Sequence, residues 1–96
     1  MSPRASDPVA ERFSANLLRA RESAGITQEE IAFRAGLHRT EIGLLEREAR
    51  MPRIDTLVKL AGALGVDPAT LLDGITWEPG DYQPGGFVEK VGEGEE

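Results

Sequence analysis

The first part of the chain carries apolar residues at helical spacing. The members of this face recur three or four positions apart: Val9, Phe13, Leu17, Ala20 and Ala24. The dipeptide Asp7-Pro8 precedes them, and an aspartate accepts from free amides at a helix start while proline fits the first helical position. Gly25 follows them, as glycine often does just beyond a helix end. The periodicity predicts a helix from about residue 8 to residue 24.

Two shorter helices are predicted next, with a glycine between them. Residues 27–30 (TQEE) match a capping box, in which a threonine caps the helix and a glutamate lies three positions later. The helix that they open is short because Gly36 ends it. A third helix is predicted from about His38 to about Arg47, and Pro52 interrupts the pattern beyond it.

A fourth and a fifth helix are predicted in the second half of the chain. The fourth ends at Gly65 and has these apolar positions: Ile54, Leu57, Leu60, Ala61 and Leu64. A second Asp-Pro pair, residues 67–68, begins a short fifth helix that ends at Gly74. Residues 7–74 are therefore expected to form one all-α domain of five helices, preceded by a flexible N-terminus over residues 1–6.

The composition changes after Gly74, where glycine, proline and acidic residues dominate. Two β-prone runs, residues 75–77 and 87–91, are separated by turn signals and are able to pair as a short β-hairpin. An alternative stays open, in which this extension (residues 75–91) is a disordered acidic tail and Trp77 only caps the fifth helix. The final residues, 92–96, are predicted to be a disordered acidic end.

The extension also holds apolar side chains whose exposure to water is unfavourable: Ile75, Trp77, Phe87, Val88 and Val91. Burying one such side chain stabilises by about 1.5–3 kcal/mol. A two-stranded hairpin is marginal alone. The hairpin should therefore pack against the helical core or against a second subunit. In the second case it would be part of a dimer interface.

Composition narrows the function classes. The chain has 96 residues, 40% of them hydrophobic, and no cysteine, which excludes disulfides, thiolate metal sites and thiol catalysis. No segment resembles a signal peptide or approaches the roughly 20 apolar residues that span a bilayer. There is one histidine, no G-x-x-x-x-G-K motif and no plausible catalytic triad. We expect a soluble cytoplasmic protein that is not an enzyme, with no metal, cofactor or membrane contact.

The formal net charge of −6 is unevenly placed. From Glu78 to the end, six acids accompany one base, a net charge of −5. Within Arg34–Arg53, five arginines accompany three glutamates, a net charge of +2. The local field matters more than the total charge for binding a polyanion. An acidic chain is therefore still compatible with DNA as a partner.

Residues 27–47 have the pattern of a helix-turn-helix. Ala32 is small where the second helix must cross the first closely, and Gly36 can adopt the positive φ that the turn needs. The apolar positions that hold the pair together are Ile31, Ala35, Leu37, Ile42 and Leu45. We interpret these five as packing residues and the polar positions between them as the functional ones.

From about Phe13 to Leu72 the chain resembles the Cro/repressor-type (XRE-like) helix-turn-helix family of prokaryotic and phage regulators. The segments that carry the resemblance are GITQEEIA, EIGLLER and PRIDTLVKLAGALGVDPATLL. The resemblance implies a five-helix, lambda-repressor-like fold that binds double-stranded DNA. It also implies that Arg21 and Glu46 pair, tying the first helix to the recognition helix; the alternative is two unrelated surface charges.

The resemblance places base-reading residues on the third helix, at Arg39 and Thr40. Arginine grips guanine O6 and N7 with two hydrogen bonds, and threonine can bond a base edge or touch a thymine methyl. Leu44 stands where a polar residue is more usual and offers only apolar contact. Glu41 would be repelled by phosphates but can accept from cytosine N4.

The remaining polar positions are expected to bind phosphates: Thr27, Gln28, His38, Arg47, Arg50 and Arg53. Gln28 lies at the first turn of a helix, where the helix dipole attracts anions. His38 replaces the usual serine or threonine cap and is either a plain surface residue or a cap or phosphate contact. Glu48 replaces the glycine that usually follows the recognition helix.

The sequence therefore predicts a dimeric, sequence-specific transcriptional regulator, most simply a repressor that reads a palindromic operator in the major groove. One recognition helix reads only a few base pairs, and specific binding usually needs ~4–10 kcal/mol over non-specific binding. The alternative is an antitoxin or adaptor whose C-terminal extension binds a partner protein, since fold alone does not settle function.

Overall fold

The computed structural model describes residues 7–89. Five helices precede a two-stranded antiparallel hairpin: α1 (Pro8–Ala24), α2 (Gln28–Ala35), α3 (Arg39–Glu46), α4 (Ile54–Leu64), α5 (Pro68–Leu71), β1 (Ile75–Glu78) and β2 (Gly86–Glu89). The predicted five-helix fold with a short hairpin is thus confirmed. The predictions for residues 1–6, 90, 91 and 92–96 lie outside the described residues. No described helix is long and apolar enough to cross a membrane.

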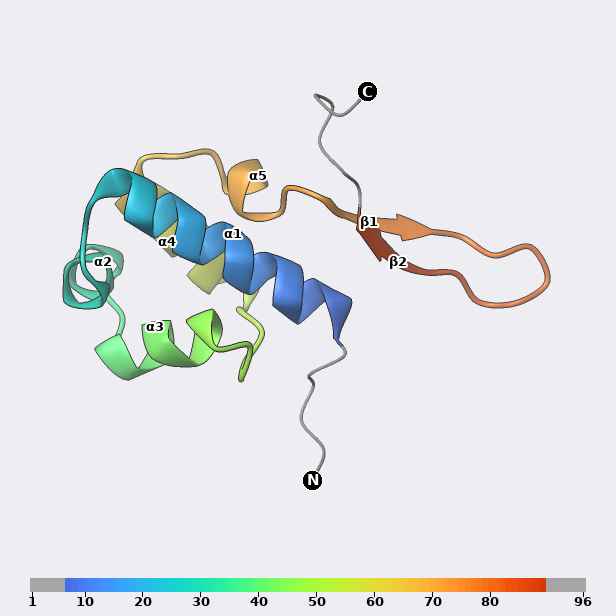
Figure 1. The fold of residues 1–96 in the computed structure, drawn as a ribbon, viewed down its shortest axis with the longest axis horizontal. Helices are drawn as coiled ribbons and strands as arrows, with labels where there is room; N and C mark the ends of the chain where they lie inside the picture. The colour runs from blue at the N-terminus through green and yellow to red at the C-terminus, as the bar shows by residue number, and fades with distance from the viewer. Residues whose placement is uncertain (1–6, 90–96) are drawn as a thin grey trace.

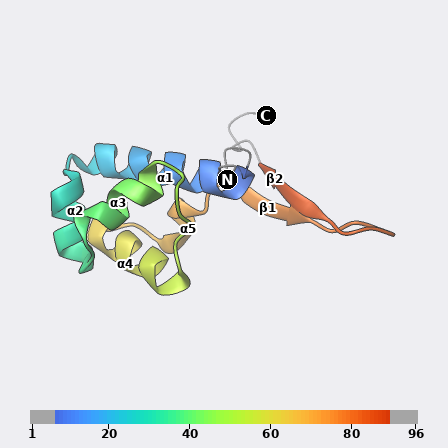
Figure 2. The ribbon, with the colours of Figure 1, turned by 90° about the horizontal axis from the view of Figure 1, so that it is seen from below.

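The helices pack into one body, and the hairpin with its connecting tip, residues 75–89, projects from it (Figures 1 and 2). We call this projection the arm. It leaves the body at the end where α1 begins, away from α2, in both views. The arm and the helix-turn-helix therefore occupy different parts of the molecule.

Local chemistry sets the helix ends. The Asp7 side chain accepts from the amides of Val9 and Ala10 at 3.0 and 3.3 Å, and the Thr27 hydroxyl accepts from the Glu30 amide at 3.0 Å. Gly25 ends α1 at φ 71°, in the left-handed region that glycine adopts without steric cost. The predicted first helix therefore has the bounds that its caps indicated.

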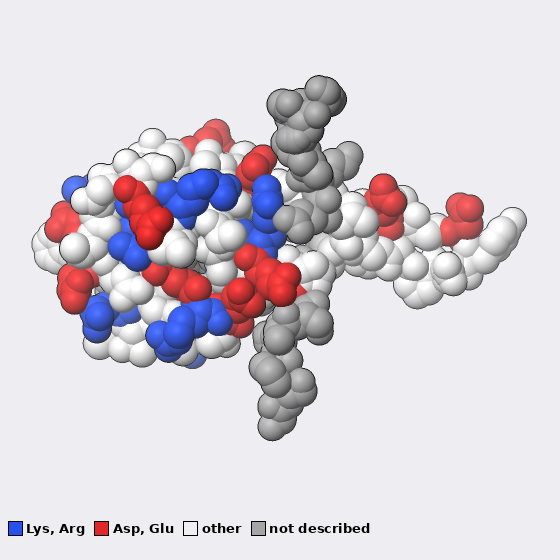
Figure 3. Space-filling model, in the orientation of Figure 1, with Lys and Arg blue, Asp and Glu red and all other residues white. Residues whose placement is uncertain are grey.

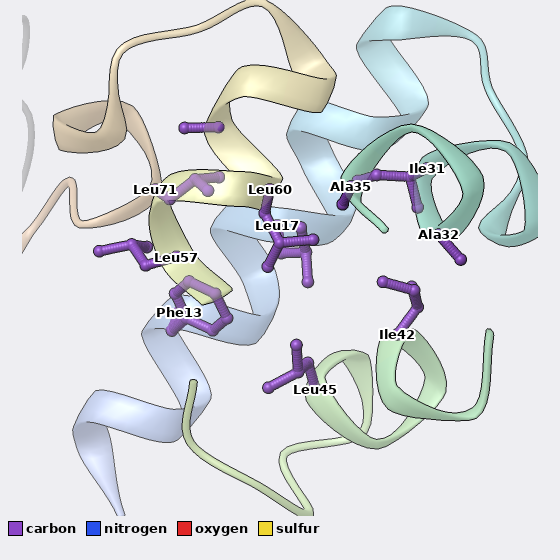
Figure 4. Close-up of a cluster of buried hydrophobic side chains, with 11 residues drawn as sticks. Phe13, Leu17, Ile31, Ala32, Ala35, Ile42, Leu45, Leu57, Leu60 and Leu71 are labelled. Atoms are coloured by element: carbon purple, nitrogen blue, oxygen red, sulfur yellow. The ribbon is translucent and has the colours of Figure 1, made fainter. Parts of the chain in front are cut away.

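The core joins all five helices. Eight of its side chains are no more than 2% exposed: Phe13, Leu17, Ile31, Ile42, Leu45, Leu60, Ala61 and Leu71. Figure 4 shows side chains from α1 and α4 meeting those from α2 and α3. Burial of this order stabilises by about 1.5–3 kcal/mol per large apolar side chain relative to exposure. The core thus holds the helix-turn-helix against the rest of the body.

The turn after α3 contains an unfavourable backbone conformation. Glu48 has φ 63°. Among residues 7–89 it is the single non-glycine residue with a positive φ. Its neighbours close the helix end, because the Ala49 amide donates to the Leu44 carbonyl at 2.9 Å. A side chain in this left-handed region costs roughly 1–2 kcal/mol.

Glu48→Gly should therefore raise the free energy of unfolding. Relief of the left-handed strain exceeds the entropy that glycine adds to the unfolded chain, leaving a net gain of roughly 0.5–1 kcal/mol. Urea unfolding measures it, with Glu48→Ala as the control that removes the charge but keeps the Cβ. The interpretation is wrong if the glycine variant is no more stable than the alanine variant.

Candidate nucleic-acid interface

A three-residue turn joins α2 to α3. Gly36 has φ 70° there, and the Leu37 amide donates to the Ala32 carbonyl at 2.9 Å, which closes the end of α2. Ala32 is 4% exposed, and its small side chain permits the two helices to approach. The turn fixes the direction in which α3 leaves α2, so the outer face of α3 has one defined orientation.

A largely buried ion pair ties α1 to the end of α3. Arg21 Nε donates to Glu46 Oε2 at 2.6 Å, and a second guanidinium nitrogen donates to Oε1 at 3.1 Å. The two side chains are only 14% and 6% exposed. The hydrogen bond from the guanidinium to the carboxylate raises the pKa of Arg21 above its ordinary value. Arg21 also donates to the Ile26 carbonyl at 2.9 Å, so the pair fixes the α1–α2 turn as well.

Gln28 belongs to the same cluster. Its side-chain amide donates to Glu46 Oε1 at 2.9 Å, and the residue is half-buried. An amide nitrogen carries two hydrogens, so one remains for a phosphate. Gln28 thus links the first turn of α2 to the last turn of α3.

Two buried polar side chains on α1 were missed by the sequence analysis. The Ser14 hydroxyl donates to the Leu45 carbonyl of α3 at 2.6 Å. The Asn16 amide donates to the carbonyls of Leu71 and Asp73 at 3.0 and 2.9 Å, where α5 ends. The sequence signal was available for Ser14, since it lies among apolar residues on the inner face of α1. Both hold neighbouring elements against α1.

The start of α3 is open to solvent. Arg39 and Thr40 are exposed, and Leu44, one turn later, is half-buried. Arg39 pairs with Glu29 of α2, with 2.9 Å between Nε and Oε2, and both side chains are more than half exposed. His38 occupies the cap position of α3 and is exposed, but its side chain makes no capping hydrogen bond.

Three further arginines follow α3. Arg50 pairs with Glu41, whose side chain is 22% exposed, and Arg53 pairs with Asp55 at 3.3 Å. Arg47 folds back along α3, because a Cβ added at Gly43 would lie 3.0 Å from its guanidinium. The Thr27 hydroxyl accepts from the Glu30 amide, as described above, and its own O–H can still donate to a phosphate.

These pairs change the electrostatic picture that the sequence suggested. Three of the arginines around α3 are paired with carboxylates, those of Glu29, Glu41 and Asp55. Of these acids, only Glu41 lies within Arg34–Arg53, the segment whose net charge was counted as +2. Figure 3 shows basic and acidic side chains interleaved over the helical body, whereas the arm shows acidic ones only. The surface around α3 is therefore less basic than the segment alone suggests.

The described residues form no metal site. Among residues 7–89 no group of three or more His, Cys, Asp or Glu side chains is placed to hold a metal ion. The chemistry that the surface around α3 offers is hydrogen bonding by guanidinium groups, a hydroxyl and an amide. Such donors suit phosphates and base edges.

Comparison with known proteins identifies the fold. The chain is 43% identical to the control protein C.BamHI of Bacillus amyloliquefaciens over 53 residues, which cover 55% of this chain and 65% of that protein, just under two thirds of its length. It is 42% identical over 57 residues to the uncharacterized HTH-type transcriptional regulator y4dJ of Sinorhizobium fredii, covering 59% of this chain and 74% of the relative.

A solved structure shows the same arrangement. The restriction-modification controller protein C.AhdI of Aeromonas hydrophila matches with a TM-score of 0.63 and 36% identity, and the match covers 69% of this chain and 97% of C.AhdI. The family model for the helix-turn-helix family HTH_3 matches residues 17–71, more than half of the chain. The resemblance noted in the sequence is thereby confirmed, and the chain belongs to the helix-turn-helix family HTH_3.

Proposed function

We propose that this protein is a sequence-specific DNA-binding transcriptional regulator that lays α3 in the major groove. The observation that carries the proposal is the exposed start of α3, held in one orientation by the buried Arg21–Glu46 pair and the Ser14–Leu45 hydrogen bond. Its relatives include the control protein C.BamHI and an uncharacterized HTH-type transcriptional regulator. Such a regulator would act in the cytoplasm of a prokaryotic cell.

The proposed roles follow from position and chemistry. Bases are read by Arg39 and Thr40, with Leu44 and Glu41 at the flanks of the same surface. Phosphates are bound by Thr27, Gln28, His38, Arg47, Arg50 and Arg53. Phosphate contacts fix the register of the protein on the duplex, and base contacts carry the sequence preference.

The ion pairs around α3 are weak enough to exchange for DNA. An exposed pair such as Arg39–Glu29 contributes only about 0.2–1 kcal/mol. A bidentate contact between an arginine and a guanine gives ~1–3 kcal/mol of discrimination. Exchange at the cognate site is therefore favourable. The carboxylates, meanwhile, lower the affinity for every DNA sequence and help to explain how an acidic chain avoids indiscriminate binding.

We propose a homodimer on a palindromic operator, most simply a repressor that acts by occlusion. Ile54 and Val58 are 76% and 52% exposed and lie one turn apart on α4, directly after the loop that carries Arg50 and Arg53. A second copy seated there would bring two α3 helices close together. The arm is the other candidate for the dimer interface. Sedimentation equilibrium of the chain truncated after Gly74 separates the two, since an unchanged dimer excludes the arm.

Arg50→Ala should weaken binding to all DNA sequences by a similar factor. Loss of one phosphate contact should also lower the slope of log K against log salt concentration by about 0.9. Gel-shift titrations on several sequences at two or more salt concentrations measure both effects. Arg34→Ala is the matched control, because Arg34 bonds to Glu30 and to the Ala63 carbonyl. Equal slopes for the two variants would remove Arg50 from the contact set.

A second candidate function is that of an adaptor or antitoxin that binds a partner protein. The specific observation in its favour is the arm, which carries exposed aromatic side chains outside the matched residues 17–71. The same gel shifts distinguish the candidates, since an adaptor without a DNA site shows no preference among sequences. The two functions are also compatible in one chain.

A further inference from the structure

The arm extends an apolar face from the core into solvent. Trp77 lies opposite Phe87 in the antiparallel register, and Ile75 is two residues away on the same side of β1. Ile75 packs against the core, whereas Trp77 and Phe87 remain 53% and 50% exposed. Their rings meet edge to face with 5.0 Å between centroids. The face is thus buried at its inner end and open at its outer end.

The base of the arm is fixed to α1. Arg12 Nε donates to the Asp73 carbonyl at 2.9 Å, beside the carbonyl contacts of Asn16. Gly74 has φ 86°, a conformation that larger residues rarely adopt, and a Cβ added there would lie 2.6 Å from Arg12 Nε and displace that guanidinium. The arm is therefore held out from the body, and it does not fold back to cover its aromatic side chains.

Three exposed aromatics gather on this short segment. Tyr82, at the tip, is fully exposed, so the arm holds Trp77, Tyr82 and Phe87 of the five aromatic residues in the chain. Tryptophan and tyrosine are the residues most enriched at energetically important positions of protein interfaces. The arm lies outside residues 17–71, which the family model matches.

The charges of the arm restrict its partner. Residues 75–89 contain Glu78, Asp81 and Glu89 and no lysine or arginine. Phosphates would be repelled, which excludes DNA. A second copy brings the same acids, and each chain has a formal net charge of −6. A cationic surface is complementary, and arginine or lysine also stacks favourably on the faces of tryptophan and tyrosine.

We propose that the arm is a docking surface for a partner protein whose contact surface carries arginine or lysine around an apolar anchor. Trp77 and Phe87 receive the anchor. Glu78 lies on the opposite side of β1 from Trp77, so Glu78 and Asp81 attract the cations through their field at the edge and tip of the arm. The arm leaves the body away from α2, so a partner at its outer end lies apart from the start of the helix-turn-helix. The proposal does not depend on the DNA-binding function.

Trp77 is the single tryptophan of the chain and reports directly on the arm. We would titrate the full chain with a seven-residue peptide that alternates leucine with arginine, and with a second that alternates leucine with glutamate. The arginine peptide should change Trp77 emission saturably below about 1 mM, and the glutamate peptide should not. No saturable change, or equal changes with both peptides, would overturn the proposal.

Variants locate the contact. Phe87→Ser should weaken binding of the arginine peptide about tenfold, as expected for losing one aromatic anchor. The double variant Glu78→Gln/Asp81→Asn, which keeps the apolar face, should weaken it about fivefold and reduce its salt dependence. The control is Phe33→Ser, because Phe33 is an 84% exposed aromatic on α2. Equal losses for Phe33→Ser, or no loss for the acidic double variant, contradict the proposal.

Measuring self-association tests whether a second copy of the chain occupies the arm instead of a cationic partner. Sedimentation equilibrium should give the same dimer dissociation constant for the wild type and for Phe87→Ser. A weaker dimer in Phe87→Ser would make a second copy the occupant of the arm and would overturn the proposal for a cationic partner. Helical circular dichroism of both proteins shows whether the body remains folded.

Discussion

Arg21→Ala should lower the free energy of unfolding by about 3–5 kcal/mol. The substitution leaves the Glu46 carboxylate, 6% exposed, in a poorly solvated site with Gln28 as its remaining side-chain donor. Removing one member of a buried pair costs this much because the other charge stays buried without compensation. The free energy of unfolding of a natural domain is only about 5–15 kcal/mol, so this loss is a large share of it. The loss also frees the end of α3, so DNA binding should fall with stability.

Urea unfolding measures this loss, with two comparisons. Arg34→Ala breaks an exposed pair, both of whose side chains are 46% exposed, and should cost no more than about 1 kcal/mol. Arg21→Met/Glu46→Leu removes both charges and should recover most of the stability, as apolar replacement of buried pairs often does. A loss in Arg21→Ala no greater than that in Arg34→Ala would show that the pair does not hold α3.

Arg39→Ala should weaken binding to the cognate operator by about 1–3 kcal/mol and relax the preference at one base pair. Arg39 is at the exposed start of α3, where, among residues 7–89, it is held by the weak pair with Glu29 alone. A guanidinium aligned with a guanine edge makes two hydrogen bonds that no other base pair accepts. Binding to the operator and to its single-base variants gives both quantities.

Arg39→Lys is the matched control for this prediction. It keeps the charge but not the planar fork, so it should lose the base preference while leaving the salt dependence nearly unchanged. A uniform loss over all single-base variants in Arg39→Ala would assign Arg39 to a phosphate instead.

Local chemistry made the helices predictable from the sequence. Asp7, Thr27 and Asp67 cap α1, α2 and α5 with their own side chains, and Gly25 and Gly65 end helices at positive φ. Each signal acts within a few residues of its position. The fifth helix is shorter than predicted. The sequence predicted that it would end at Gly74, whereas in the structure it ends at Leu71. The Asn16 amide reaches the Leu71 and Asp73 carbonyls and fixes the chain there in a non-helical path.

Contacts between distant segments were not predictable in this way. The Arg39–Glu29 and Arg50–Glu41 pairs depend on how two elements are placed, and no periodicity along the chain encodes them. The pairing of Arg21 with Glu46 was inferred only from the family resemblance. The hairpin was predicted from its two β-prone runs, but its register, with Glu78 opposite Gly86, required the structure. The roles of the residues toward DNA stay predictions.

Selection of binding sites from a random DNA library is the most direct test of the central claim that α3 reads DNA sequence. The account predicts enrichment of a palindromic site whose half-sites lie about one helical turn, roughly 10 base pairs, apart. Selection with Arg39→Ala should return the same site with one guanine position relaxed in each half. No enriched site for the wild type, or an identical site for both proteins, would contradict the account.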